Sequence, residues 1–293
     1  MTSLLLAGTI GTQLDTIFAG FDYSVFEFFG SMQSSFMTLI AKCLTALGSE
    51  VFIILFAVMG LVMIFFKRTR KLGIAVVIAV IVGTLITNVA IKPLVLRIRP
   101  YNTLQTDPQY WAWYTGAGML SESDYCFPSG HTTGNMEIAI VLMLCHITSK
   151  RKAAKGFCWL FPVGALLVGA SRIYLMVHYA TDVIGGVIVG IVAGIIGYVA
   201  ASLITRKHAN DPETVAVLER NVRTGGAVAI ALAVIVMFIF AAYYVRANGG
   251  QEAVRCAFDG DYKCQNEAKT SSKYPPIDGK YYCKIHWNEL NGK

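Results

Sequence analysis

The stretch LGIAVVIAVIVGTLITNVAI, residues 72–91, contains no charged residue. A helix of about 20 apolar residues is long enough to cross the hydrocarbon core of a bilayer. Residues 183–205 and 224–245 are uncharged runs of similar length. The chain of 293 residues is 55% hydrophobic and 15% charged, with a mean hydropathy of +0.55. Soluble domains of this length are rarely so apolar, so the sequence predicts a membrane protein.

Three further apolar segments are shorter or hold a polar residue, but each is bounded by charge: residues 51–66, 132–148 and 156–171. Together with the three uncharged runs, they predict six spans. Buried helices of a soluble protein are the alternative, which the charged boundaries of the whole set disfavour. The predicted fold is therefore all-α, a polytopic membrane helical bundle of about six transmembrane helices.

The N-terminal region differs from these spans. Residues 13–35 mix Phe and Tyr with Asp and Glu, which is typical of a helix lying on the membrane surface. Residues 36–49 predict a second interfacial helix or an extension of the first span. The chain thus divides into four predicted parts. These are N-terminal interfacial helices (1–49), a transmembrane core (50–205), a cytoplasmic loop with the sixth span (206–246), and a polar, Cys-containing extracytoplasmic tail (247–293).

Positive charge is distributed unevenly between the loops. The loops at 67–71, 149–155 and 206–223 carry four Lys or Arg residues each. Cytoplasmic loops accumulate such residues, so these three loops are predicted to face the cytoplasm. The net charge of +7 follows from this topology, and no nucleic-acid partner is expected. Residues 92–130 and 171–182 would then face outward, as would both termini.

Four cations run against that rule, because the outward segments contain Lys92, Arg97, Arg99 and Arg172. Lys92 and Arg99 are seven residues apart in KPLVLRIRP, so a helix would present both on one face before Pro100 ends it. Two such cations suit a doubly charged anion, since Lys supplies a point charge and Arg a planar fork. A pair of side chains reaching to the membrane interface is the alternative.

A second motif, PSGH at 128–131, lies on the same predicted side, directly before a span. Its Pro and Gly favour a tight turn, after which Ser129, Gly130 and His131 would open a helix. Free backbone N–H groups and the helix dipole favour an anion at such a helix start. A simple N-cap and an interfacial histidine are the alternative interpretations.

The third motif is SRIYLMVHYATD, residues 171–182. Arg172 ends one predicted span, and His178 and Asp182 begin the next. The last two are four residues apart, one helical turn, so the carboxylate could hold the imidazole N–H. An imidazole held by a carboxylate in this way is the base-and-orienter pair found in nucleophilic sites. A polar pair that caps a helix is the alternative.

Together the motifs read KxxxxxxRP, PSGH and SRxxxxxHxxxD, and this set resembles the signature of the type 2 phosphatidic acid phosphatase family, the membrane lipid phosphate phosphatases. The resemblance covers roughly residues 50–205, and neither the tail nor the sixth span. Met176 and Ala180 stand where members often carry Gly and Pro. The matching positions are Lys92, Arg99, Pro100, Pro128, Ser129, Gly130, His131, Ser171, Arg172, His178 and Asp182.

The resemblance implies a phosphatase that needs no metal or other cofactor. His178, oriented by Asp182, would attack phosphorus and form a phosphohistidine, and His131 would protonate the leaving oxygen. No acidic cluster or Cys/His set with ligand spacing is evident on the outward side, so no catalytic metal is expected. The non-bridging oxygens would be bound by Lys92, Arg99, Ser129, Gly130 and Arg172.

The substrate and partners follow from the same resemblance. A lipid phosphate in the bilayer is expected, at the outer headgroup level of a cell membrane. Undecaprenyl pyrophosphate, phosphatidylglycerol phosphate and phosphatidate all fit, because the cations recognise phosphate and not the lipid tail. A lipid phosphotransferase on the same scaffold is the main alternative, and a non-catalytic anion or lipid transporter is another. The oligomeric state stays open.

Several residues outside the motifs carry secondary expectations. The loop 101–127 contains YWAWY, which is predicted to anchor at the membrane interface, or else to form a lid. Asn88, one turn before Lys92, is expected to orient that lysine. Glu137, within a span, is expected to make an interhelical hydrogen bond.

The outward cysteines leave two possibilities open. Four cysteines fall on that side, and they could form up to two disulfides or remain free thiols. The remaining histidines are interpreted as bystanders. The cysteines are Cys126, Cys256, Cys264 and Cys283, and the histidines are His146, His208 and His286.

Overall fold

The computed structural model describes residues 9–148, 157–205, 255–260, 263–268 and 274–291. The predicted sixth span at 224–245, the loop at 206–223 and His208 lie outside the described residues. Among the described residues the chain is helical, and its only β-type pairings are three isolated bridges in the tail. This confirms the all-α class for that part of the chain.

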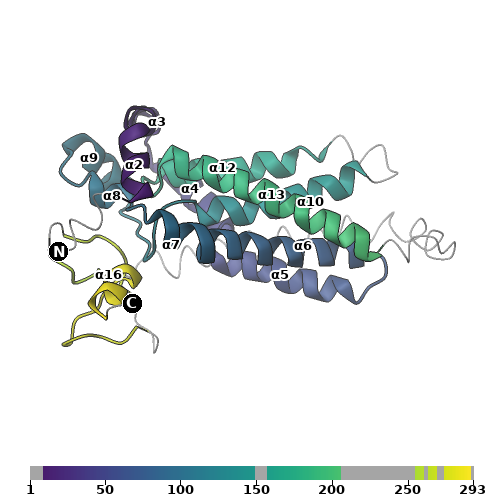
Figure 1. The fold of residues 1–293 in the computed structure, drawn as a ribbon. Helices are drawn as coiled ribbons and strands as arrows, with labels where there is room; N and C mark the ends of the chain where they lie inside the picture. Colours follow the sequence, from purple (N-terminus) through teal and green to yellow (C-terminus); the bar gives the residue numbers. More distant parts are fainter. Residues whose placement is uncertain (1–8, 149–156, 206–254, 261–262, 269–273, 292–293) are drawn as a thin grey trace.

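The long helices form a bundle, and the short ones gather at one end of it. Figure 1 shows α5, α6, α10, α12 and α13 running alongside one another, with α2, α3, α8, α9 and α16 at one end. The helices are α2 (Ile10–Ile17), α3 (Ala19–Ser31), α4 (Ser35–Leu47), α5 (Glu50–Ile64), α6 (Arg70–Thr84), the π-helix η1 (Leu85–Ile91), α7 (Lys92–Val95), α8 (Pro100–Thr103), α9 (Pro108–Gly116), α10 (Gly130–Ile147), α12 (Leu160–Tyr174), α13 (Ala180–Thr205) and α16 (Lys284–Leu290).

Close packing of α13 against α10 depends on glycine. A Cβ atom added at Gly190 would lie 2.6 Å from Met136 Cβ, and one at Gly194 would lie 2.7 Å from Ile140 Cβ. Any larger residue would therefore force the two helices apart. Small residues four positions apart are a common device for close helix approach in membranes. This contact brings the start of α10, with PSGH, next to the start of α13, with Asp182.

Among the described residues, fewer than six helices are long and apolar enough to be counted as spans. By length and composition, two helical stretches of the described residues are suited to cross a membrane, Arg70–Thr103 and Ala180–Thr205. A third arises if Ser35–Leu47 and Glu50–Ile64, which meet at a bend of 41°, form one span. Helix α12 has only 15 residues, and α10 begins with polar residues of the motif. The predicted count of six is thus not confirmed, although the apolar helices indicate a membrane location.

The helix predicted to carry both Lys92 and Arg99 ends between them. Helix α7 stops at Leu96, whose φ of +55° is left-handed. Such a residue commonly terminates a helix and turns the chain aside. Arg99 follows in an extended conformation, with φ of −73° and ψ of 148°, and Pro100 is the first residue of α8. The predicted shared helical face is therefore wrong, and Pro100 begins a helix instead of ending one.

An aromatic core fixes the segment that precedes His178. Tyr110 and Tyr114, from the YWAWY cluster in α9, are fully buried together with Phe26 of α3. The Tyr110 hydroxyl donates a hydrogen bond of 2.5 Å to the carbonyl oxygen of Met176. These two rings therefore support the interior of the protein and do not anchor it at a membrane interface. Their burial ties α3 and α9 to the segment between α12 and α13.

Candidate active site

Lys92 and Arg99 converge on one carboxylate although they do not share a helix. Lys92 Nζ lies 2.5 Å from Asp124 Oδ2, and Arg99 Nη2 lies 2.7 Å from Asp124 Oδ1. Arg99 Nε also donates to the backbone oxygen of Asp124, at 2.9 Å. Both cationic side chains are buried, whereas the Asp124 side chain is 27% exposed. An anionic group from the loop before α10 therefore occupies the two cations.

Arg172 makes a similar pair with a neighbouring acid. Its Nη2 lies 2.5 Å from Glu122 Oε1, and its Nη1 donates to Thr45 Oγ1 of α4 at 2.6 Å. The third donor, Nε, is buried and has no hydrogen-bond partner among the described residues. A buried guanidinium N–H without an acceptor costs free energy, so this donor is available to a bound anion.

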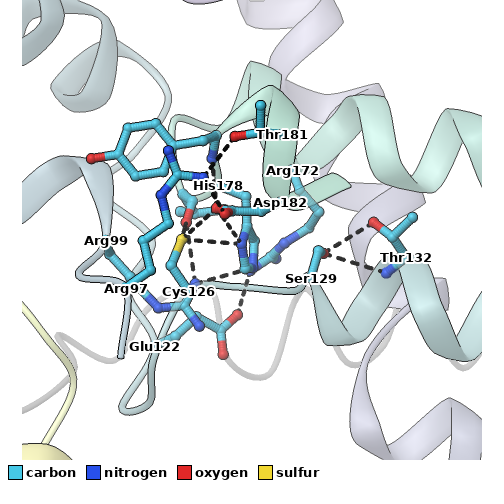
Figure 2. A network of polar contacts seen from close by, with 12 residues as sticks. Arg97, Arg99, Glu122, Cys126, Ser129, Thr132, Arg172, His178, Thr181 and Asp182 are labelled. Carbon is cyan, nitrogen blue, oxygen red and sulfur yellow. Dashed lines mark hydrogen bonds and ion pairs between the residues drawn. The ribbon is translucent and has the colours of Figure 1, made fainter. Parts of the chain in front are cut away.

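His178 is buried with both ring nitrogens close to polar groups, as Figure 2 shows. Its Nε2 lies 3.1 Å from Arg99 Nη1. Its Nδ1 lies 3.4 Å from Asp182 Oδ2 and 3.3 Å from Cys126 Sγ. An Nδ1–H that donates toward Asp182 leaves the Nε2 lone pair facing the cations, which is the tautomer of a nucleophile. The predicted pairing of His178 with Asp182 is present, although α13 begins only at Ala180.

Asp182 is held in place by several donors. Cys126 Sγ lies 2.7 Å from Asp182 Oδ2, and the backbone N–H of Tyr179 donates to the same oxygen at 2.9 Å. Arg97 Nη1 contacts the other oxygen, Oδ1, at 2.6 Å. Neither Cys126 nor Arg97 was among the predicted site residues. Both residues lie in loops beside two of the motifs, where no helical or strand periodicity in the sequence marks a residue as part of the site.

Arg97 connects the N-terminal helices to the site. Its guanidinium is fully buried and pairs with Asp15 of α2 and Asp22 of α3, each at 2.8 Å, in addition to Asp182. It also lies over the Tyr179 ring, 3.8 Å from the centroid. One cation thus offsets three carboxylates in a buried cluster. Of the four cations predicted to face outward, Arg97 is the one that the motifs leave out, and its contacts tie α2 and α3 to Asp182.

The PSGH segment lies where the motif predicts, at the start of α10. Ser129 is the N-cap, and its Oγ accepts hydrogen bonds from the backbone N–H and the hydroxyl of Thr132. The Ser129 N–H in turn donates to the backbone oxygen of Asp182 at 3.0 Å. A Cβ atom at Gly130 would lie 3.8 Å from Lys92 Nζ, so the lysine reaches this helix start. The glycine and serine therefore sit beside the cations.

Charge in the cluster changes the ionisation of its loop groups. Burial raises the pKa of Glu122, but attraction to Arg172 and His131 outweighs it and lowers the pKa to about 2. Burial likewise raises the pKa of Asp124, yet Lys92 and Arg99 hold it well below its ordinary value. The His131 side chain packs against Gly48, where an added Cβ atom would lie 2.9 Å from His131 Cδ2. Burial first, and then Arg99 and Arg172, lower the pKa of His178 well below its ordinary value, so its imidazole is neutral.

Cys126, His178 and Asp182 also form a group that could hold a metal ion, because their ligand atoms lie within 4.8 Å of one another. The Sγ–Oδ2 distance of 2.7 Å is that of a hydrogen bond. Two ligands of a tetrahedral zinc lie roughly 3.5 Å apart. The geometry therefore fits a hydrogen-bonded trio in which the thiol and the imidazole both donate to the carboxylate.

Several secondary predictions are not met. Asn88 is exposed, and Lys92 pairs with Asp124 instead. Glu137 Oε2 is buried without a hydrogen-bond partner among the described residues, so the predicted interhelical bond is missing at that oxygen. The four cysteines predicted to face outward are free thiols, which is one of the two possibilities that the sequence left open. Cys126 contacts Asp182, whereas the three tail cysteines gather with His286.

The comparisons with known proteins bear on this cluster directly. Residues 71–206 match the family model of the PAP2 superfamily. The match covers a little under half of the chain, and over these residues the chain is similar to the PAP2 superfamily. The matched region runs from α6 to the end of α13 and includes all the motif positions from Lys92 to Asp182. The N-terminal helices, which supply Asp15, Asp22 and Thr45, precede it.

Two curated relatives resemble this chain over part of its length. An undecaprenyl-diphosphatase of Sulfolobus acidocaldarius is 33% identical over 131 residues, which is 44% of this chain and 54% of that protein. Phosphatidylglycerophosphatase B of Bacillus subtilis is 29% identical over 153 residues, 50% of this chain and 67% of that protein. The chain thus spans between about half and two thirds of the length of these relatives.

A solved structure supports the fold. The crystal structure of a transmembrane PAP2 type phosphatidylglycerolphosphate phosphatase from Bacillus subtilis covers 67% of this chain and 92% of its own. The TM-score is 0.54, with 24% sequence identity. This likeness shows a membrane PAP2 fold.

Proposed function

We propose that this protein is an integral-membrane lipid phosphate or pyrophosphate phosphatase that works through a phosphohistidine at the extracytoplasmic face. The observation that supports it most is the contact of Arg99 with Nε2 of a neutral His178, at 3.1 Å. Lys92 shares Asp124 with Arg99, and Arg172 pairs with Glu122 of the same loop. Three cations around one nucleophile match the charge of a phosphoryl group, whose non-bridging oxygens need stabilisation during transfer. The similarity of the core to the PAP2 superfamily and the names of the relatives support the same reaction class.

In the first step, His178 Nε2 attacks phosphorus. The approach is open only after the phosphate displaces Asp124 from Lys92 and Arg99, which then bind its oxygens. Arg172 Nε, buried and without an acceptor, donates to a further oxygen. Asp182 accepts the Nδ1–H and stabilises the positive charge that develops on the imidazole. Cys126 and Arg97 keep that carboxylate in position.

His131 completes the reaction from the start of α10. As general acid it gives a proton to the leaving oxygen of the lipid, and as general base it then takes one from the water that hydrolyses the phosphohistidine. The N–P bond breaks, inorganic phosphate leaves, and His178 returns to its neutral form. Backbone N–H groups at the start of α10, at Gly130 and His131, stabilise the same oxygens. The residues themselves supply the charge stabilisation, so the proposed reaction proceeds without a catalytic metal.

The proposed substrate is a lipid carrying a terminal phosphate or pyrophosphate. Undecaprenyl pyrophosphate and phosphatidylglycerol phosphate are the first candidates, because relatives carry the names of enzymes for these two compounds. Phosphatidate is the third. The cations bind phosphate oxygens common to all three, so the choice depends on the apolar surfaces beside the cluster.

A panel of these three lipids, assayed for phosphate release with purified protein in detergent, tests the proposal. We expect release without any added acceptor and during brief exposure to EDTA. The rate of phosphate release by His178→Ala should be at least 1,000-fold lower than that of the wild type, as is roughly expected when a nucleophile is removed. The matched control is His146→Ala, a histidine at the other end of α10. Phosphate release that persists in His178→Ala would refute the mechanism, and transfer only to an added alcohol would favour a phosphotransferase.

A second assay tests the proposed side of the membrane. Intact cells or spheroplasts should hydrolyse a membrane-impermeant, short-chain lipid phosphate added from outside. The orientation rests on the Lys- and Arg-rich loop at 67–71, predicted to be cytoplasmic, which lies at the opposite end of α6 from the cluster. Hydrolysis only after the cells are broken would place the site at the cytoplasmic face.

A further inference from the structure

Four side chains of the tail gather at one point: Cys256, Cys264, Cys283 and His286. Their ligand atoms all lie within 4.8 Å of one another, and each residue is no more than 6% exposed. His286 Nδ1 is 3.2 Å from Cys283 Sγ and 3.4 Å from Cys256 Sγ. Neighbouring ligands of a tetrahedral zinc lie roughly 3.5 Å apart, since Zn–S and Zn–N bonds are about 2.3 and 2.0 Å long. The spacing fits a single ion.

The described residues of the tail contain little regular structure. It consists there of the seven-residue helix α16 and three isolated bridges. Its buried core consists of the three cysteines and Ile285, with Phe258 and Tyr282 partly buried beside them. Units of about 40 residues or fewer usually need disulfides or a metal ion to stay folded. Three cysteines cannot all pair with one another, and these three form no disulfide.

We propose that Cys256, Cys264, Cys283 and His286 bind a structural zinc ion. Three thiolates and one imidazole are a donor set of structural zinc sites, and thiolates favour zinc over magnesium or calcium. Because four protein ligands fill a tetrahedral ion, no position stays open for water or substrate. The ion therefore folds the tail and takes no part in phosphate chemistry. His286, interpreted from sequence as a bystander, is a ligand in this arrangement.

Neighbouring groups orient the ligands in the manner of a metal site. The Phe258 ring stacks on the His286 imidazole, with centroids 3.8 Å apart and planes within 2°. Asn266 Nδ2 donates a hydrogen bond to Cys283 Sγ at 3.6 Å, which suits a thiolate ligand. Such outer contacts fix ligand orientation and raise metal affinity.

The same tail segment docks on the loops that line the phosphatase cluster. Asn266 Oδ1 accepts hydrogen bonds from Tyr101 Oη at 3.1 Å and from Asn102 Nδ2 at 2.9 Å. The backbone N–H of Glu267 donates to the Glu122 backbone oxygen at 3.3 Å. Asn266 therefore links the zinc ligand Cys283 to α8, which begins right after Arg99. The zinc ion is placed to hold the tail against the loop that carries Glu122.

The test is the metal content of the full-length protein, purified in detergent without added metal or chelator. We expect about one zinc per chain by elemental analysis, and tetrahedral thiolate–cobalt absorption after exchange with Co²⁺. Cys264→Ser should lower the zinc content at least tenfold. The matched control, Cys43→Ser in α4, should keep it. Zinc that is equally abundant in Cys264→Ser, or a metal-free wild-type protein with a disulfide among the three tail cysteines, would overturn the proposal.

A second measurement uses the wild-type protein, so that the test does not depend on whether Cys264→Ser folds. Zinc is removed from the wild-type protein with a strong chelator, and trypsin cleavage within the tail is followed by mass spectrometry. Cleavage after Lys263 and Lys280 should rise at least tenfold and fall again when Zn²⁺ alone is returned. Equal rates of tail cleavage with and without zinc would contradict a structural zinc site. Neither readout depends on phosphatase activity, so the zinc proposal and the proposed function fail separately.

Discussion

Replacement of Asp124 by Asn should strengthen the binding of inorganic phosphate. Asp124 makes two charge-assisted contacts, 2.5 Å to Lys92 and 2.7 Å to Arg99, and a phosphate must displace both. A hydrogen bond to a charged group contributes about 1.5–3 kcal/mol. In Asp124→Asn, the phosphate-free protein loses at least one of these charge-assisted contacts, so phosphate has less to displace. Since 1.4 kcal/mol corresponds to a tenfold change, the expected gain is roughly 10- to 100-fold in affinity.

The assay is competitive inhibition of phosphatase activity by orthophosphate, measured in Asp124→Asn and in wild type. Asp278→Asn is the matched control, because it removes the same charge from an exposed turn whose φ of 49° suits Asn. Its inhibition constant should stay within twofold of wild type. An Asp124→Asn inhibition constant that is unchanged or weaker would refute the reasoning, since the carboxylate would then serve to position the cations.

The pH dependence follows with a definite sign. The Asp124 pKa is depressed in the folded protein, because attraction to Lys92 and Arg99 exceeds the opposing effect of burial. Its pairing is therefore fully present above the ordinary value near 3.8 and is lost only as the pH falls through the lower folded pKa. The advantage of Asp124→Asn over wild type should accordingly persist from pH 8 to pH 5. A gain that disappears by pH 5 would contradict this ionisation.

Three more predictions concern groups behind the cations. Arg97→Met leaves the buried carboxylates of Asp22 and Asp182, and the partly exposed one of Asp15, without their cation. The loss should cost about 3–5 kcal/mol and lower the thermal midpoint in detergent by roughly 5–15 °C, whereas Arg97→Lys should lose less. Cys126→Ala should lower kcat roughly 3- to 10-fold with little change in KM, because the thiol touches Asp182 and not the substrate. Because the pKa of His178 is depressed, kcat/KM corrected for substrate ionisation should stay level from pH 7 down to about pH 5.5; a fall centred near 6.5 would show an ordinary imidazole.

The motif residues of the cluster were predictable because their chemistry is local. Ser129 is the N-cap of α10 and Gly130 its first residue, as expected for a turn sequence that precedes a helix. His178 and Asp182 are four residues apart in the chain. Short-range spacing of this kind depends on backbone geometry within a few residues. The apolar runs likewise predicted helices, since only a helix satisfies the backbone of a long apolar segment in a membrane.

The positioning residues could not be predicted in the same way. Asp15 and Asp22 lie more than 70 residues before Arg97, and their pairing depends on α2 and α3 folding over the end of the bundle. Leu96 adopts a left-handed conformation, which a sequence usually indicates by Gly or Asn and not by Leu. Its turn decides that Arg97 points to Asp182 while Arg99 reaches His178.

The sequence by itself determined the helical, apolar core and the three motifs similar to those of PAP2 proteins, and it supplied the candidate groups for binding and attacking a phosphate. The tertiary structure alone decided that loop acids occupy those cations, that Arg97 links the N-terminal helices to Asp182, and that three distant cysteines meet His286. The reason is the range of the interactions. Helix formation and motif spacing are set within a few turns of chain, whereas ion pairs and metal ligands depend on which segments packing brings together.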